Sequence, residues 1–257
     1  MAYGSAATLI AYIFIILGWD KLNLSFNSAY MLAGLSCFAL AVIGYISFPH
    51  FKAPVPQTKK MVIRKRYWLY YLLQFLSGAR RQIFVVFAGF MMVERFGMDV
   101  QQLTTLYLIN LILNIALAPL LGRAVARYGE RNALAVEYFG LAVVFFAYGG
   151  IYLFGWGILI AASLYILDHL FFALALAIKT YFQKIADPQD IAATAAVAFT
   201  INHIAAIFLP VSLGFLWLIS PFLVFCTAGT LAIFSFVLAL LIPREPRIGK
   251  ETIFCVS

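Results

Sequence analysis

The sequence predicts an all-α fold, a polytopic membrane bundle of about eight transmembrane helices. Of its 257 residues, 65% are hydrophobic and 11% are charged, whereas a soluble domain carries about 25% charged residues. Apolar stretches of about 20 residues, enough to cross roughly 30 Å of hydrocarbon as a helix, recur almost end to end. These stretches are continuous, unlike the short alternating strands of a membrane barrel.

The apolar stretches and their polar breaks define the expected elements in chain order. The first begins almost at Met1 without a basic segment before it, so we interpret it as a span and not as a signal peptide. After the second, residues 49–67 contain prolines and many cations and are predicted to form a basic linker. The expected spans are 3–19, 29–48, 68–93, 103–121, 133–153, 157–181, 192–218 and 221–242.

The expected domains follow from these breaks. Residues 1–48 would form a pair of transmembrane helices, and residues 68–242 a bundle of six, separated by the linker 49–67. Residues 243–257 would form a tail. Because the breaks between the last six spans are short, neighbouring helices should pack antiparallel.

The distribution of Lys and Arg predicts the orientation, because cations are enriched in cytoplasmic loops. The net charge of +8 comes from cations in short runs between apolar stretches, which argues against a nucleic-acid partner. Both termini and the 49–67 linker are therefore expected on the cytoplasmic side of the cell membrane, or inner membrane. Lys21 and Arg95 lie on one side, and fourteen cations on the other: Lys52, Lys59, Lys60, Arg64, Lys65, Arg66, Arg123, Arg127, Arg131, Lys179, Lys184, Arg244, Arg247 and Lys250.

A motif lies at residues 119–132, Pro-Leu-Leu-Gly-Arg-Ala-Val-Ala-Arg-Tyr-Gly-Glu-Arg-Asn, between the second and third spans after the linker. Here the sequence resembles the major facilitator superfamily of secondary transporters, which carries a Gly-x-x-x-Asp-Arg-x-Gly-Arg-Arg motif in such cytoplasmic loops. A positively charged turn without family meaning is the alternative interpretation. Gly122, Arg127, Gly129 and Arg131 match the motif, whereas Ala126 and Glu130 depart from it.

The resemblance implies an incomplete transporter. The family is built from two six-helix halves, so 68–242 would be the C-terminal half and 1–48 the last two helices of the N-terminal half. Substrate paths form between the halves. The expected partners are therefore the lipid bilayer, a small-molecule substrate, and either a missing N-terminal half or another copy of this chain.

Polar residues inside the spans are the candidate site residues, because an intramembrane charge costs about 2.5–3.5 kcal/mol on insertion scales. Gln74, Ser77, Gly78 and Arg81 share one helical face. Arg80 lies about 100° around the helix from Arg81, so only one of the two should face the path directly. We predict that this face contacts an anionic group of the substrate; an ion pair with another helix is the alternative.

Four more residues, in two adjacent pairs, complete the candidate site. Asp168 and His169 lie near the middle of the 157–181 span, where either could couple transport to protons. Alternatively, Asp168 forms a structural ion pair with Arg80 or Arg81. Asn202 and His203 would supply hydrogen bonds to substrate, or would only join helices, as polar side chains between membrane helices often do.

The leading hypothesis for function is secondary active transport of a small solute by alternating access, as a truncated or partial transporter. A non-transporting remnant or scaffold is the alternative. A membrane-embedded enzyme is disfavoured, because the sequence has no nucleophile motif, His-Glu-x-x-His spacing or phosphate-binding glycine loop. The three cysteines show no paired spacing, and we expect neither a metal nor a cofactor.

Overall fold

The computed structural model describes residues 2–21, 25–48 and 63–254, and the side chains of 7–17, 25–48 and 63–254. Most of the predicted linker, the side chain of Lys21 and all of Cys255 lie outside the described residues. The described part is helical and contains no β-strand, only an isolated bridge between Arg247 and Lys250. Seven helical stretches in it are long and apolar enough to cross a membrane. The predicted all-α, polytopic fold is thereby confirmed.

The helices follow the expected spans. The helices α1 and α2 form the pair before the linker, and nearly all of their residues are apolar. The apolar stretch in α1, Ala7–Leu17, is shorter than the other spans. The elements are α1 Ala2–Lys21, α2 Phe26–Ser47, η1 Lys65–Tyr67, α3 Trp68–Gln82, η2 Ile83–Ala88, α4 Gly89–Phe96, α5 Val100–Tyr128, α6 Glu130–Phe154, α7 Ile158–Phe172, η3 Ala173–Ala175, α8 Leu176–Ile185, η4 Pro188–Asp190, α9 Ile191–Ile219 and α10 Pro221–Leu240.

Two predicted spans are interrupted helices. The 68–93 span contains a π-helical segment, η2, directly after the arginine pair, and the 157–181 span contains a 3-10 turn, η3, between α7 and α8. π-helical segments are rare and frequently occur at functional sites. The length of an apolar stretch predicts a continuous helix and does not reveal such changes of helical pitch.

The sequence predicted a loop between the spans that end at residue 121 and begin at residue 133, and the structure corrects this prediction. The loop consists of Gly129 alone, with φ 82°, between the end of α5 and the start of α6. Gly122 and Arg127 are helical residues of α5, and Arg131 belongs to α6. The segment after Pro119 is rich in Leu, Ala and Arg, which are good helix formers, so α5 continues beyond its apolar stretch.

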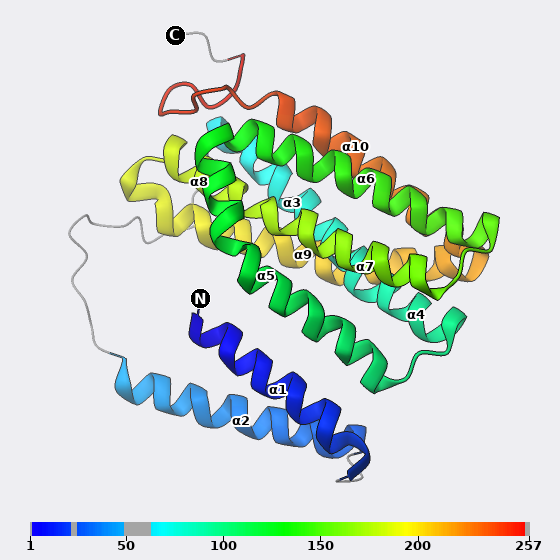
Figure 1. The fold of residues 1–257 in the computed structure, drawn as a ribbon. Coiled ribbons are helices and arrows are strands. Elements are labelled where there is room, and N and C mark those ends of the chain that lie inside the picture. Colours follow the sequence, from blue (N-terminus) through cyan, green and yellow to red (C-terminus); the bar gives the residue numbers. More distant parts are fainter. Residues whose placement is uncertain (1, 22–24, 49–62, 255–257) are drawn as a thin grey trace.

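Figure 1 shows the helices lying roughly along one direction, with α6 beside α10 and α3 beside α9. The helix α1 packs on α5, where the Gln101 side chain donates a hydrogen bond to the Ile16 carbonyl over 3.5 Å. The helix α2 lies on the outside of α1 and has no buried residue. The buried core lies within 67–242, in two clusters centred on opposite ends of the bundle.

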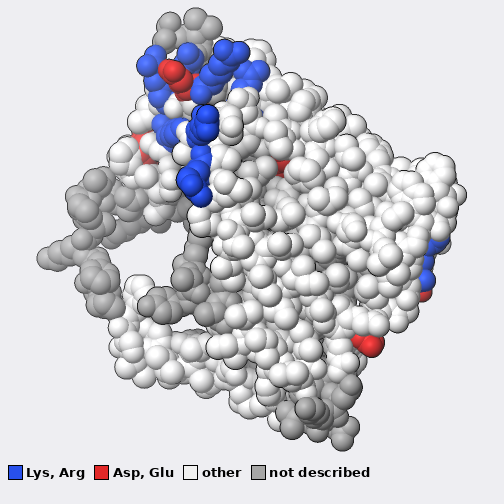
Figure 2. All heavy atoms as spheres, viewed as in Figure 1, with Lys and Arg blue, Asp and Glu red and all other residues white. Residues whose placement is uncertain are grey.

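Most of the basic side chains visible in Figure 2 gather at one end of the bundle, and a broad uncharged surface separates them from a smaller charged group at the other end. Ion pairs join the helix ends at the basic end: Lys184 of α8 lies 2.7 Å from Glu130 of α6, and Arg64 lies 2.8 Å from Asp190. The hydrogen bond and the charge of Asp190 raise the pKa of the Arg64 guanidinium. This charge segregation is what a bilayer-spanning bundle requires.

The segment after α10 folds back onto this charged end. The Tyr181 hydroxyl donates a 2.6 Å hydrogen bond to the Glu251 carbonyl, and the Ile253 amide donates one of 3.0 Å to Leu241. The Glu251 side chain is 4% exposed and lies 3.9 Å from the Arg66 guanidinium. Glu251 and Ile253 therefore hold this segment against the bundle, while residues 247–250 are exposed.

Candidate functional site

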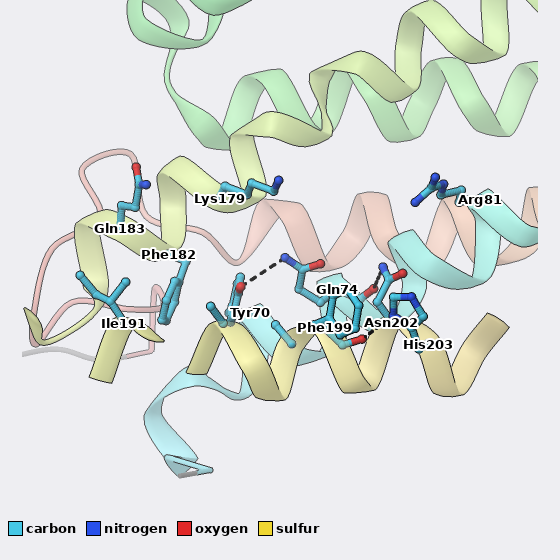
Figure 3. Close-up of a pocket in the computed structure, with 12 residues that line it drawn as sticks. Tyr70, Gln74, Arg81, Lys179, Phe182, Gln183, Ile191, Phe199, Asn202 and His203 are labelled. Carbon is cyan, nitrogen blue, oxygen red and sulfur yellow. Dashed lines mark hydrogen bonds between the residues drawn. The ribbon is translucent and has the colours of Figure 1, made fainter. Parts of the chain in front are cut away.

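A cavity of about 520 Å³ lies between α3, α8 and α9 near the charged end of the bundle. Figure 3 shows it in close-up. Four of the residues proposed to bind substrate, on α3 and α9, line it together. The lining comprises Tyr70, Gln74, Arg81, Lys179, Phe182, Gln183, Ile191, Ala195, Ala198, Phe199, Asn202 and His203.

The close approach of α3 and α9 positions two of these side chains. Gly78 permits it, because a Cβ at this position would lie 2.9 Å from the Asn202 carbonyl oxygen. The Asn202 side chain donates a hydrogen bond to the Gln74 carbonyl over 3.4 Å, and the Gln74 amide donates to the Tyr70 hydroxyl over 3.3 Å. Amide and hydroxyl groups thus form a continuous polar strip along the cavity wall.

Aromatic rings line the rest of the wall. Tyr70 and Phe182 stack with ring centroids 4.2 Å apart, and Phe199 and His203 lie 4.0 Å apart. The His203 Nδ1 atom lies 2.8 Å from the Phe199 carbonyl. The cavity therefore combines apolar contact area with a few polar groups, as small-molecule sites commonly do.

The two adjacent arginines have different environments. Arg81 is exposed and lines the cavity. Arg80 is only 1% exposed, and its guanidinium lies over the Tyr138 ring at 4.1 Å and 3.8 Å from the Glu137 carboxylate. Its Nε atom donates to the Leu76 carbonyl over 3.2 Å. Arg80 is thus part of a buried charge cluster, and Arg81 is the arginine that a solute in the cavity can reach.

Asp168 and His169 line a second, smaller cavity of about 240 Å³ together with both arginines. Arg81 therefore borders both cavities. Asp168 is 2% exposed and lines this cavity with Arg80. However, no ion pair within 4 Å joins it to either arginine in the described part of the chain. The close ionic partner of Arg80 is Glu137.

Sequence reasoning missed Glu137 and Lys179 as site residues. It did not consider Glu137 for the site, although this residue is fully buried, and it counted Lys179 only as an orientation signal. A signal for Lys179 was present, because residues 179, 182 and 183 share one face of a helix. All three line the larger cavity.

The four motif residues line neither cavity: Gly122 and Arg127 lie in α5, Gly129 forms the turn, and Arg131 lies in α6. The Arg127 guanidinium lies 5.5 Å from the Tyr128 ring centroid. Glu130, which departs from the family motif, is the residue that pairs with Lys184. The motif region therefore ties α6 to α8, the helix that carries Lys179.

A comparison with protein-family models matches residues 1–210 to the Major Facilitator Superfamily. This match spans α1 to the middle of α9 and so includes both cavities and the turn at Gly129. No curated protein matches the chain.

Proposed function

Because this chain belongs to the Major Facilitator Superfamily, a family of secondary transporters, we propose that it moves a small anionic solute across the cell membrane by alternating access. The solute site would be the larger cavity, with Arg81 as the main anion contact and Gln74, Asn202 and His203 as hydrogen-bonding groups. Both termini would face the cytoplasm, as the cation count predicts.

The observation that carries this proposal is the charge of the cavity. Arg81 is exposed in it, and no acidic side chain is among its lining residues. In the described residues, no ion pair neutralises Arg81. A guanidinium supplies a rigid, planar set of donors that matches a carboxylate or phosphate, so an anion is the ligand that completes this arrangement.

Proton coupling is assigned to the buried cluster beside the cavity. The buried Glu137 carboxylate lies 3.8 Å from the Arg80 guanidinium, and the buried Asp168 lines the same small cavity as Arg80. Two buried carboxylates near one guanidinium carry an excess negative charge, and one proton relieves it. Because Arg81 borders both cavities, solute binding at Arg81 is placed to influence protonation of Asp168, with His169 as a second group that can carry the proton.

The wall opposite the cavity is proposed to come from a second bundle. Every lining residue belongs to α3, α8 or α9, whereas α1 packs on α5. Alternating access requires two bundles that rock around the site. The second bundle would be a separately encoded N-terminal half or another copy of this chain. A demonstrated monomer in liposomes should then show no saturable flux.

Transport is tested in membrane vesicles from the cells that naturally produce the chain, where a separately encoded half would also be present. We expect saturable uptake of radiolabelled small carboxylates that is stimulated by an inward proton gradient. Arg81→Gln should abolish it at equal chain abundance, whereas Arg123→Gln, which removes an exposed cation of α5, should leave it unchanged. Equal uptake by the Arg81→Gln vesicles would show that the cavity is not the solute site. A lack of uptake by the unmodified chain would favour the scaffold alternative.

A further inference from the structure

Two cations from different helices face each other across the larger cavity. Figure 3 shows the Lys179 side chain of α8 and the Arg81 side chain of α3 pointing toward each other, and both line the cavity. We propose that the solute carries two separate anionic groups, one bound by Arg81 and the other by Lys179. This inference depends on the proposed function, in which the cavity is the solute site.

The first argument is that these two cations lack protein counter-ions. Three other cations of α3, α8 and the segment before α3 do have one: Lys184 pairs with Glu130 at 2.7 Å, Arg80 with Glu137 at 3.8 Å, and Arg66 with Asp187. For Arg81 and Lys179, the described residues provide no such ion pair.

Placing two unpaired cations around one cavity creates a repulsion that a single carboxylate relieves only in part. Charges of like sign facing one cavity raise each other's energy, and a counter-charge at each of them lowers it. A solute with one anionic group would neutralise Arg81 and leave Lys179 without a partner. A solute with two would neutralise both.

The wall between the cations suits a short solute backbone. The amides of Gln74 and Asn202 lie along this wall, beside the stacked rings of Tyr70 and Phe182. The cavity volume of about 520 Å³ accommodates a small molecule. The expected ligand class is therefore a small dicarboxylate, or a short acid that also bears a phosphate group.

The two cations should have unequal roles. The planar guanidinium of Arg81 can bind a carboxylate through two parallel hydrogen bonds, whereas the Lys179 ammonium is a point charge on a flexible stem. Arg81 would hold one anionic group in either class of solute. Lys179 would discriminate a dianion from a monoanion.

The test measures binding to the 257-residue chain in lipid nanodiscs by isothermal titration calorimetry. The probes are dicarboxylates from malonate to adipate, each compared with the monocarboxylate of equal carbon number. We expect at least one dicarboxylate to bind about tenfold or more tightly than its monocarboxylate, as a charged hydrogen bond implies. Lys179→Gln should reduce this difference to within about twofold without weakening monocarboxylate binding, and Lys179→Arg should restore it.

Controls separate this inference from the proposed function. Lys250→Gln, which removes an exposed cation outside the cavity, should leave the preference unchanged, and retained monocarboxylate binding shows that Lys179→Gln is folded. If every dicarboxylate binds no better than its monocarboxylate, or if Lys179→Gln preserves the difference, the dianion inference is wrong. The proposed function would still stand if Arg81→Gln removed the remaining binding. If neither class of probe binds the unmodified chain, both proposals fail.

Discussion

Replacing both Glu137 and Asp168, the two buried carboxylates near Arg80, tests whether they stabilise its charge in the membrane. The Arg80 guanidinium lies 3.8 Å from the Glu137 carboxylate, and at an effective dielectric constant near 20 this corresponds to about 4 kcal/mol of Coulomb attraction. In Glu137→Gln, Asp168 can take over as the counter-ion, so we expect a loss of about 1 kcal/mol, and a similar loss in Asp168→Asn. In the double variant, Arg80 is buried without a counter-ion, and the expected loss is about 3–5 kcal/mol.

The assay is unfolding in mixed micelles titrated with denaturing detergent, which gives the free energy of unfolding of each variant. The double loss should exceed the sum of the single losses by at least about 1 kcal/mol. Adding Arg80→Leu to the double variant should recover stability, because the uncompensated charge is then gone. Additive losses would show that the two carboxylates do not share Arg80, and the proposed proton site would lose its basis.

Three further predictions concern packing, the tail and orientation. Gly78→Ala should destabilise the chain by about 1–2 kcal/mol, because its Cβ would press on the α9 backbone. Gly214→Ala in α9, where a Cβ meets nothing within 4 Å, should be neutral or stabilising in the same unfolding assay. Tyr181→Phe should lower the free energy of unfolding by about 1 kcal/mol through loss of its hydrogen bond to the tail. The protection of residues 243–254 from protease should fall as well. Unchanged protection would contradict the contact between the tail and the bundle. A cysteine at position 250 should react with membrane-impermeant reagents only in inverted vesicles, and labelling of intact cells would reverse the predicted orientation.

The fold class and the helix positions were accessible from the sequence, because each depends on local composition. A run of about 20 apolar residues identifies a span without knowledge of its neighbours. Helical periodicity also placed Gln74 and Arg81 on one face, and the structure brings both into the same cavity as Asn202 and His203. These features arise within single helices.

Contacts between side chains of different helices could not be predicted from the sequence in the same way. Which acid pairs with Arg80 depends on the rotation and depth of α6 and α7 relative to α3, and the periodicity of one helix says nothing about another. Asp168 was therefore chosen for its central position, although Glu137 lies closest to Arg80. Lys179 was likewise assigned by its charge and not by the face it shares with Phe182 and Gln183.

The single-residue turn at Gly129 illustrates a different limit. Polar and charged residues after Pro119 resemble a loop by composition, but Ala, Leu and Arg also favour helix. The helix α5 therefore runs to Tyr128, past the apolar stretch that ends near residue 121. Hydropathy locates the part of a helix that is surrounded by hydrocarbon, and not the end of the helix.

The most direct test of the central claim, that an anionic solute binds in the cavity at Arg81, is ligand protection of a cysteine placed there. Ala195→Cys, at an exposed lining position, would be made in a cysteine-free background and labelled with a thiol reagent in nanodiscs. A dicarboxylate should slow labelling at position 195, and adding Arg81→Gln should abolish this protection. Lys250→Cys, outside the cavity, should label at the same rate with and without the anion. Equal protection in the presence and absence of the Arg81 guanidinium, or no protection by any small anion, would contradict the account.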